Sequence, residues 1–199
     1  MIAVITGDII NSRKEPAPTW LPVLKEVLNH YGKEPVDWEI FRGDSFQLTL
    51  PPEEAVFAGL HLKAAIKQIK DLDVRLGLGL GEQEHKAKKI SESNGTAYVR
   101  SGECFEALKK QNLGIVSGDP EFDETLNLMF LLALLTANNW SQTVAEAIRS
   151  SLENPGKSQK EIAELLGKSQ SSLSEALKRG GYEEIMKLEE YYRKRSAAL

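Results

Sequence analysis

The chain has 199 residues, of which 41% are hydrophobic and 27% charged, and its formal net charge is −4 at pH 7. This length suffices for one large domain or two small ones with a sizeable core. The acidic balance argues against a protein that binds polyanions through bulk positive charge. A lone cysteine, Cys104, excludes an intrachain disulfide framework and fits a reducing compartment.

The sequence shows no signal for secretion or for a membrane. The first strand-like run begins at Ile2, with no basic leader before it. The most apolar stretch, residues 126–135, has about half the length that a membrane-spanning helix needs. We therefore expect a cytoplasmic protein in which this stretch is a buried helix.

Strand and helix patterns alternate over the first 118 residues. Continuous apolar runs and period-two alternation indicate strands, whereas apolar residues spaced by three and four indicate helices. In chain order the patterns predict a strand, a helix, a two-stranded hairpin, a helix, a strand, a helix and a strand at residues 2–5, 19–31, 38–50, 53–70, 73–81, 101–110 and 113–117. We expect Ser101 to cap the last of these helices. The order predicts an α+β, ferredoxin-like sandwich with the helices on one face of a mixed sheet.

Glycine alternates with leucine in the predicted strand at residues 73–81. Gly77 and Gly79 separate Leu76, Leu78 and Leu80. Period two indicates a strand, and glycine at every second position indicates that another element packs very close to one face.

The character of the chain changes after residue 118, because no strand pattern follows. Five helices are predicted at residues 123–138, 141–152, 159–166, 169–179 and 182–195. We therefore expect two domains, an α+β domain over residues 1–118 and an all-α domain over residues 123–199.

Two Gly-Asp pairs, Gly7-Asp8 and Gly43-Asp44, are the most informative feature of the α+β domain. Each pair ends an apolar run. If the two runs are neighbouring strands, Asp8 and Asp44 lie side by side at the rim of the sheet. Such carboxylates repel each other unless a cation lies between them, and oxygen ligands suit Mg²⁺ with a phosphate. The alternative is that each aspartate only supports a tight turn at its glycine.

Other polar residues give weaker signals. Arg42 and Arg75 could each reach a phosphate or pair with a nearby carboxylate. The three histidines, His30, His61 and His85, are too scattered along the sequence to predict a metal site.

Residues 159–179 have the spacing of a helix-turn-helix. Ala163 is small enough for a close crossing of two helices, and Gly167 permits the positive φ of a tight turn. Ser169 is suited to cap the second helix. The residues expected to face DNA lie at the start of that helix and along its outer side: Lys168, Ser169, Gln170, Ser171, Ser172, Ser174 and Lys178.

The net charge of the C-terminal region gives little support to DNA binding by this motif. Residues 151–199 hold nine basic and eight acidic residues, a net charge of +1. One copy therefore gains little affinity from counterion release, whereas a homodimer would double the electrostatic contact. Residues 126–135 could supply the seam of such a dimer. The alternative is a three-helix module used for protein contact.

The chain resembles the SatD-like family of bacterial proteins, which are small two-part proteins with a C-terminal helix-turn-helix. The resemblance covers nearly the full length. It is carried by the stretches at residues 7–13, 41–47, 92–95 and 100–105 and by the terminal motif.

The first 118 residues also resemble, more distantly, the palm domain of class III nucleotide cyclases. This resemblance implies that Asp8 and Asp44 bind a metal ion together with the backbone carbonyl of Ile9. It further implies a phosphate or nucleotide site. The residues of that site would be Asn11, Ser12, Arg13, Arg42 and Ser45.

The chain departs from the cyclase pattern at two places. Ile40 or Phe41 stands where the hairpin strand of a cyclase usually presents a lysine to the base. Where a cyclase helix carries an Asn and an Arg, this chain offers Val99 or Arg100, and Glu103. These departures argue against cyclisation and leave ligand binding or another phosphoryl transfer open.

Two functions follow from these motifs. The favoured one is a DNA-binding regulatory protein whose cyclase-like domain binds a nucleotide or other phosphate ligand with Mg²⁺. The alternative is a metal-dependent enzyme that carries out phosphoryl or nucleotidyl transfer, with the helical domain used for assembly. A third possibility is that the cyclase-like domain is an inactive scaffold.

Overall fold

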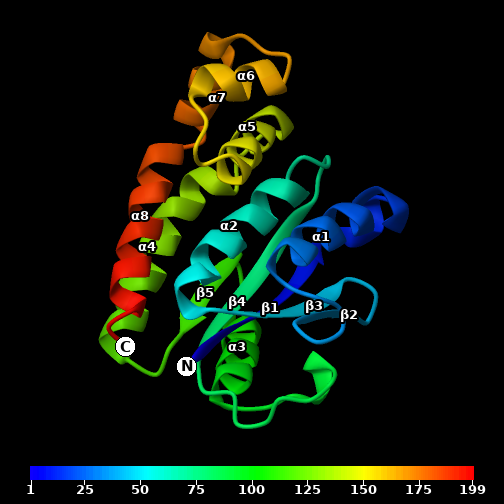
Figure 1. Ribbon diagram of the computed structural model, residues 1–199, viewed down its shortest axis with the longest axis vertical. Helices are drawn as coiled ribbons and strands as arrows, with labels where there is room; N and C mark the ends of the chain where they lie inside the picture. Colours follow the sequence, from blue (N-terminus) through cyan, green and yellow to red (C-terminus); the bar gives the residue numbers. More distant parts are fainter.

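The structure, a computed structural model, describes residues 1–199 as one five-stranded sheet and eight α-helices (Figure 1). The strands are β1 (Ile2–Ile10), β2 (Trp38–Phe41), β3 (Ser45–Leu50), β4 (Asp73–Gly81) and β5 (Leu113–Val116). The helices are α1 (Ala17–Tyr31), α2 (Ala55–Ile66), α3 (Thr96–Ala107), α4 (Pro120–Ala137), α5 (Gln142–Glu153), α6 (Gln159–Leu165), α7 (Gln170–Arg179) and α8 (Tyr182–Ser196). Short 3-10 helices lie at Ser12–Lys14, Pro52–Glu54 and Ile90–Glu92.

The sheet is mixed, as predicted, with the order β2-β3-β1-β4-β5. The central strand β1 pairs antiparallel with both β3 and β4, and β2 pairs antiparallel with β3. Only β4 and β5 are parallel. The hairpin β2–β3 turns at residues 42–44, where Arg42 and Gly43 both have positive φ. The hairpin prediction is therefore confirmed.

Helices cover both faces of the sheet, and the prediction of a single covered face was wrong. α2 lies against the leucine face of β4, where Gly59 faces Leu76 and Leu113. α3 crosses the glycine face, so that a Cβ at Gly77 would lie 2.5 Å from the backbone nitrogen of Phe105. The close approach that the glycines predicted is confirmed. Successive side chains of a strand point to opposite sides of the sheet, so the leucines of β4 face α2 and its glycines face α3.

The prediction that α3 begins at Ser101 was also wrong. The helix begins at Thr96, directly after Gly95, whose φ of 147° is open only to glycine. Ser101 is buried inside the helix, where its hydroxyl lies 2.9 Å from the carbonyl oxygen of Tyr98 and 3.0 Å from the hydroxyl of Thr6. A serine can occupy a helix interior when its hydroxyl bonds back to the preceding turn.

The C-terminal region is helical, and its core is continuous with that of the sheet. One cluster of 45 buried apolar residues includes strand residues such as Ile5 and helix residues such as Leu173 and Tyr192. The Tyr192 hydroxyl on α8 donates to the carbonyl oxygen of Pro52, 2.5 Å away, just before α2. The two predicted domains thus share one core, and the division of the chain into two domains remains a prediction.

α4 differs from the fully buried helix that its composition suggested. It packs on β5 and α8 through residues such as Phe130 and Leu134. Four leucines on its outer side remain exposed: Leu128 (57%), Leu131 (45%), Leu132 (61%) and Leu135 (71%). The helix therefore has apolar residues both on the side that packs against the rest of the chain and on the side that faces solvent. None of the helices combines the length and the apolar character that crossing a bilayer requires.

Candidate functional site

The two aspartates of the Gly-Asp pairs line one cleft. Strand register pairs Asp8 of β1 with Ser45 of β3, so Asp44 precedes the partner of Asp8. The backbone N–H of Ile9 donates to the carbonyl oxygen of Asp44 at 3.3 Å, which joins the end of β1 to the hairpin turn. Both side chains line a cleft of about 590 Å³ at this end of the sheet.

Most of the predicted phosphate-binding residues line the same cleft. Asn11, Ser12 and Arg13 follow β1 and line the cleft, and Asn11 has a left-handed φ of 62° just before the 3-10 helix Ser12–Lys14. Arg42 and Ser45 are not among the lining residues: Arg42 is exposed in the hairpin turn, and Ser45 is half-buried in β3.

Each carboxylate already has a partner in the protein. The guanidinium of Arg75 donates to both oxygens of Asp8, with an Nη2–Oδ2 distance of 2.6 Å and an Nε–Oδ1 distance of 3.3 Å. The Ser12 hydroxyl donates to Oδ2 of Asp44 at 2.5 Å. Arg75 also lies over the ring of Phe105, 4.4 Å from its centroid. Of the two alternatives for Arg75, pairing with a carboxylate is confirmed.

Four further lining residues were not predicted from the sequence: Lys14, Lys109, Gln111 and Asn112. The last three form a polar run between α3 and β5. This run reaches the cleft because β5 is parallel to β4, with Leu113 opposite Leu76. Only the sheet order brings the run beside Asp8, and that order is not visible in local sequence patterns.

The cleft carries more positive than negative charge. Its lining includes the basic residues Arg13, Lys14, Arg75 and Lys109 and the acidic residues Asp8 and Asp44, a net charge of +2. The whole chain, by contrast, has a net charge of −4. A concave, positively charged surface on an acidic protein raises the local concentration of anions.

The residues fit Mg²⁺ only as an ion that arrives with a phosphate. No group of three or more His, Cys, Asp and Glu side chains is arranged to hold a metal ion by itself. Mg²⁺, however, is commonly held by one or two carboxylates together with phosphate oxygens and water. Asp44 keeps an oxygen outside its bond to Ser12, whereas Asp8 would have to share its oxygens with Arg75.

The residues at the cyclase-type helix positions lie elsewhere. Arg100 donates to the carbonyl oxygens of Leu80 and Ser117 at 2.7 and 2.6 Å. Leu80 pairs with Ala3, at the end of β1 far from Asp8. Arg100 therefore bonds at the opposite end of the strands from Asp8, and it does not line the cleft.

Two of the three histidines are far apart in the sequence but lie close together in the structure. The rings of His30 and His61 meet edge to face, with their centroids 5.6 Å apart. His61 is buried and bonds to the Tyr31 hydroxyl at 3.0 Å and to Glu153 at 2.9 Å. Burial lowers the pKa of His61, although Glu153 partly offsets this effect. These contacts join α1, α2 and α5.

α6 and α7 form the predicted helix pair. Gly167 has a φ of 61° in the turn between them, and Ser169 accepts a hydrogen bond from the backbone N–H of Ser172 as the N-cap of α7. Ala163 and Leu173 are buried between the helices. α5 packs against both, which completes a three-helix unit.

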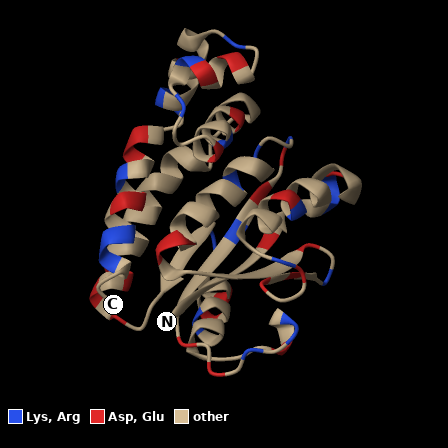
Figure 2. Cartoon of the chain, in the orientation of Figure 1, with Lys and Arg blue, Asp and Glu red and all other residues tan.

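Six of the seven predicted DNA-facing residues are exposed. These are Ser169, Gln170, Ser171, Ser172, Ser174 and Lys178. The seventh, Lys168, forms an ion pair with Glu146 of α5 and is half-buried. Figure 2 shows basic and acidic residues mixed over α6–α8 instead of a continuous basic stripe.

Of three comparisons with known proteins, one gives a match, and this match covers residues 1–199. No curated protein matches the chain, and no solved structure matches it either. The model of the SatD family matches residues 1–199, and the chain therefore belongs to the SatD family.

Proposed function

We propose that this SatD-family protein is a DNA-binding regulator whose sheet domain binds a nucleotide or other phosphate ligand together with Mg²⁺. The observation that carries the proposal is the net positive cleft with two carboxylates, joined in one chain to an exposed α7. Charge, hydrogen-bond donors and acidic ligands in one concave site suit a metal-bound phosphate.

The topology supports the proposal. The first four strands have the order β2-β3-β1-β4, with α1 between β1 and β2 and α2 between β3 and β4. We infer that this βαββαβ unit is ferredoxin-like and belongs with the palm of nucleotide cyclases. β5 and α3 extend it. In this interpretation Asp8 and Asp44 share the carboxyl end of β1 with the backbone of Ile9.

The phosphate groups would contact the turn after β1. Arg13 and Lys14 appear in no ion pair within the protein, and neither does Lys109 on the opposite wall. These side chains are free to neutralise phosphate charge, and Mg²⁺ would bridge the phosphate to Asp44 and Asp8.

DNA binding would use two copies of the chain. One helix-turn-helix with little net charge gains little from phosphate contacts, and a dimer doubles them. The exposed leucines of α4 give a surface for the second copy. Beside them lies an apolar groove of about 630 Å³ between α4 and α8, lined by Met129, Leu132, Ile185 and Leu188, among others. A ridge next to a groove on one face is self-complementary about a two-fold axis.

The enzymatic alternative is favoured by the two carboxylates in one cleft, because metal-dependent phosphoryl transfer works mainly through positioning and charge neutralisation. Incubation with Mg²⁺ or Mn²⁺ and each nucleoside triphosphate tests it. Product above the level of an Asp44→Asn control would support an enzyme, and no product above that level would exclude it for these substrates.

The regulatory proposal is tested by selecting genomic DNA fragments with the full chain at low salt, with and without nucleotide and Mg²⁺. We expect a preferred sequence whose enrichment changes with nucleotide. A Gln170→Ala/Ser171→Ala variant should lose it, whereas a Lys194→Ala variant, at an exposed lysine of α8 outside the α4–α8 groove, should keep it. Recovery of no preferred sequence would contradict the proposal.

A further inference from the structure

A second groove continues the Asp8–Asp44 cleft toward the helical region. It has a volume of about 570 Å³, and its lining includes Lys67, Lys70, Asp71, Lys110, Ser141 and Gln142. We call it the distal groove. Ile10, Asn11 and Asn112 line both the cleft and the distal groove, so the two spaces adjoin.

The positive charge continues from one space into the other. Lys70 and Lys110 of the distal groove take part in no ion pair, as is also true of Arg13, Lys14 and Lys109 in the cleft. Asp71 is the only acidic residue of the distal groove that lacks an ion-pair partner. The unpaired basic side chains therefore outnumber the unpaired acidic ones along the whole length of both spaces.

The wall between the two spaces is fixed by hydrogen bonds. Nδ2 of Asn11 donates to the carbonyl oxygen of Asp71 at 3.0 Å, which ties the turn after β1 to the loop before β4. Nδ2 of Asn112 donates to Asp73 at 3.3 Å and to Asn138 at 3.2 Å. The shared residues are thereby held in position before any ligand arrives.

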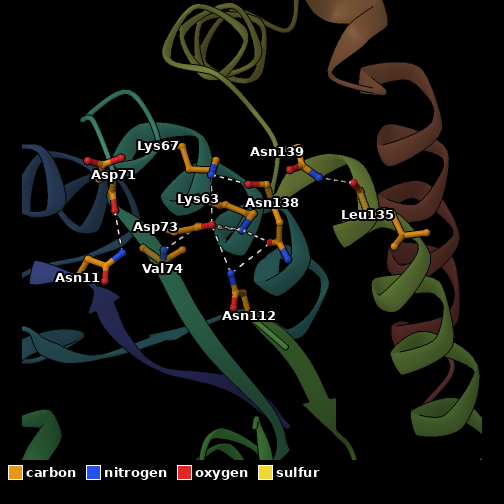
Figure 3. Close-up of polar contacts among 10 residues, drawn as sticks. All are labelled: Asn11, Lys63, Lys67, Asp71, Asp73, Val74, Asn112, Leu135, Asn138 and Asn139. Carbon is orange, nitrogen blue, oxygen red and sulfur yellow. Dashed lines mark hydrogen bonds and ion pairs between the residues drawn. The ribbon is translucent and has the colours of Figure 1, made fainter. Parts of the chain in front are cut away.

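Behind this wall lies a buried ion pair, drawn in Figure 3. Nζ of Lys63 lies 2.8 Å from Oδ1 of Asp73 and 2.8 Å from Oδ1 of Asn138. Burial lowers the pKa of Lys63, and the carboxylate of Asp73 opposes that shift. Since its partner Lys63 is internal, the charge of Asp73 is compensated and does not cancel that of Lys70 and Lys110.

We propose that one extended ligand with phosphate groups at two separate places occupies both the cleft and the distal groove, namely the phosphodiester backbone of a dinucleotide or of a short single strand. This inference rests on the proposed function of the cleft. A mononucleotide bound in the cleft would leave Lys70 and Lys110, which line only the distal groove, without a phosphate. A second phosphate linked to the first would reach them across Asn11 and Asn112, with charge-assisted hydrogen bonds at both ends.

The test compares three probes by calorimetry with the full chain in Mg²⁺: ATP, a 5′-phosphorylated dinucleotide and a six-nucleotide single strand. We expect the dinucleotide or the strand to bind about tenfold or more tightly than ATP, since two further charged contacts form. Whichever of these two probes binds more tightly shows whether the ligand is a dinucleotide or a longer single strand. A Lys70→Ala/Lys110→Ala variant should lose this advantage and still bind ATP as the wild type does.

A Lys86→Ala/Lys88→Ala variant, with two exposed lysines of the loop after β4, is the matched control and should bind all three probes normally. Equal affinity for all probes, or an equal loss for ATP and the longer ligands in Lys70→Ala/Lys110→Ala, would overturn the inference. If ATP binds and Asp44→Asn abolishes it, but the longer probes gain nothing, only this inference fails. If no probe binds, the proposed function of the cleft fails with it.

Discussion

The guanidinium of Arg75 on β4 donates hydrogen bonds to both carboxylate oxygens of Asp8 on the neighbouring strand β1. The side chain of Arg75 is 34% exposed and that of Asp8 is 21% exposed, so the pair is open to the cleft. A guanidinium in this position neutralises the carboxylate before any cation arrives. The ligand-free cleft therefore does not need a metal ion to separate Asp8 from Asp44, and a metal must compete with Arg75.

Replacing Arg75 by methionine should raise the affinity of the free protein for Mn²⁺. The substitution keeps an unbranched side chain about as long as the aliphatic part of arginine and leaves two carboxylates without an ion-pair partner in one cleft. We expect the Kd for Mn²⁺, measured by electron paramagnetic resonance, to fall by about tenfold. Arg42→Met, at an exposed arginine outside the cleft lining, is the control and should change nothing. An unchanged Kd in Arg75→Met would show that the carboxylates do not act together.

The close packing of α3 on β4 predicts opposite effects for two glycine substitutions. A Cβ at Gly77 would lie 2.5 Å and 2.7 Å from backbone atoms of Phe105, which cannot move without shifting α3. Gly77→Ala should therefore destabilise the protein by about 3 kcal/mol. Gly102 lies inside α3 with open space around the added Cβ, so Gly102→Ala should stabilise it by about 0.5–1 kcal/mol. Urea denaturation checks both, and a mild effect at Gly77 would contradict the observed packing.

The exposed leucines of α4 predict a change of oligomeric state. If Leu131 and Leu135 form the seam of a homodimer, a Leu131→Glu/Leu135→Glu variant should be monomeric where the wild type is a dimer. Light scattering coupled to size-exclusion chromatography measures this. Leu165→Glu replaces a leucine that is 62% exposed on α6, away from the exposed leucines of α4, and should leave the dimer intact. A wild type that stays monomeric at all concentrations would contradict the dimer.

The sequence predicted secondary structure and local motifs well because their signals are local. The hairpin at Gly43, the glycine face of β4 and the turn at Gly167 each depend on residues close together in the chain. The rest depends on long-range packing. Lys109 and Asn112 reach the cleft only through the parallel pairing of β5 with β4, and the exposure of α4 depends on which of its sides other elements cover.

The buried position of His61 predicts a loss of stability at acidic pH. Burial lowers the pKa of His61 in the folded protein, whereas in the unfolded chain it is about 6.5. Between these values the unfolded state binds more protons, so the free energy of unfolding should fall as the pH is lowered from about 7. His61→Gln should flatten this dependence between pH 7.5 and 5.5 in urea titrations. His85→Gln, at an exposed histidine, should retain the full wild-type dependence. An equal slope in His61→Gln would assign the effect to another group.

The ion pair of Lys63 and Asp73 predicts strong coupling between the two residues. Lys63 is 2% exposed and Asp73 is 8% exposed, so removal of one charge leaves the other buried. Lys63→Met should cost about 3–4 kcal/mol, even with Nζ of Lys67 3.4 Å from Asp73. The double variant Lys63→Met/Asp73→Leu removes both charges and should be less destabilised than the sum of the single variants, by about 2 kcal/mol. Because Asn112 donates to the same carboxylate and lines the cleft, we also expect the double variant, which removes that carboxylate, to weaken ATP binding more than Lys63→Met does. Additive free energies in urea denaturation would show that Lys67, Asn112 and the backbone N–H of Val74 satisfy Asp73 without Lys63.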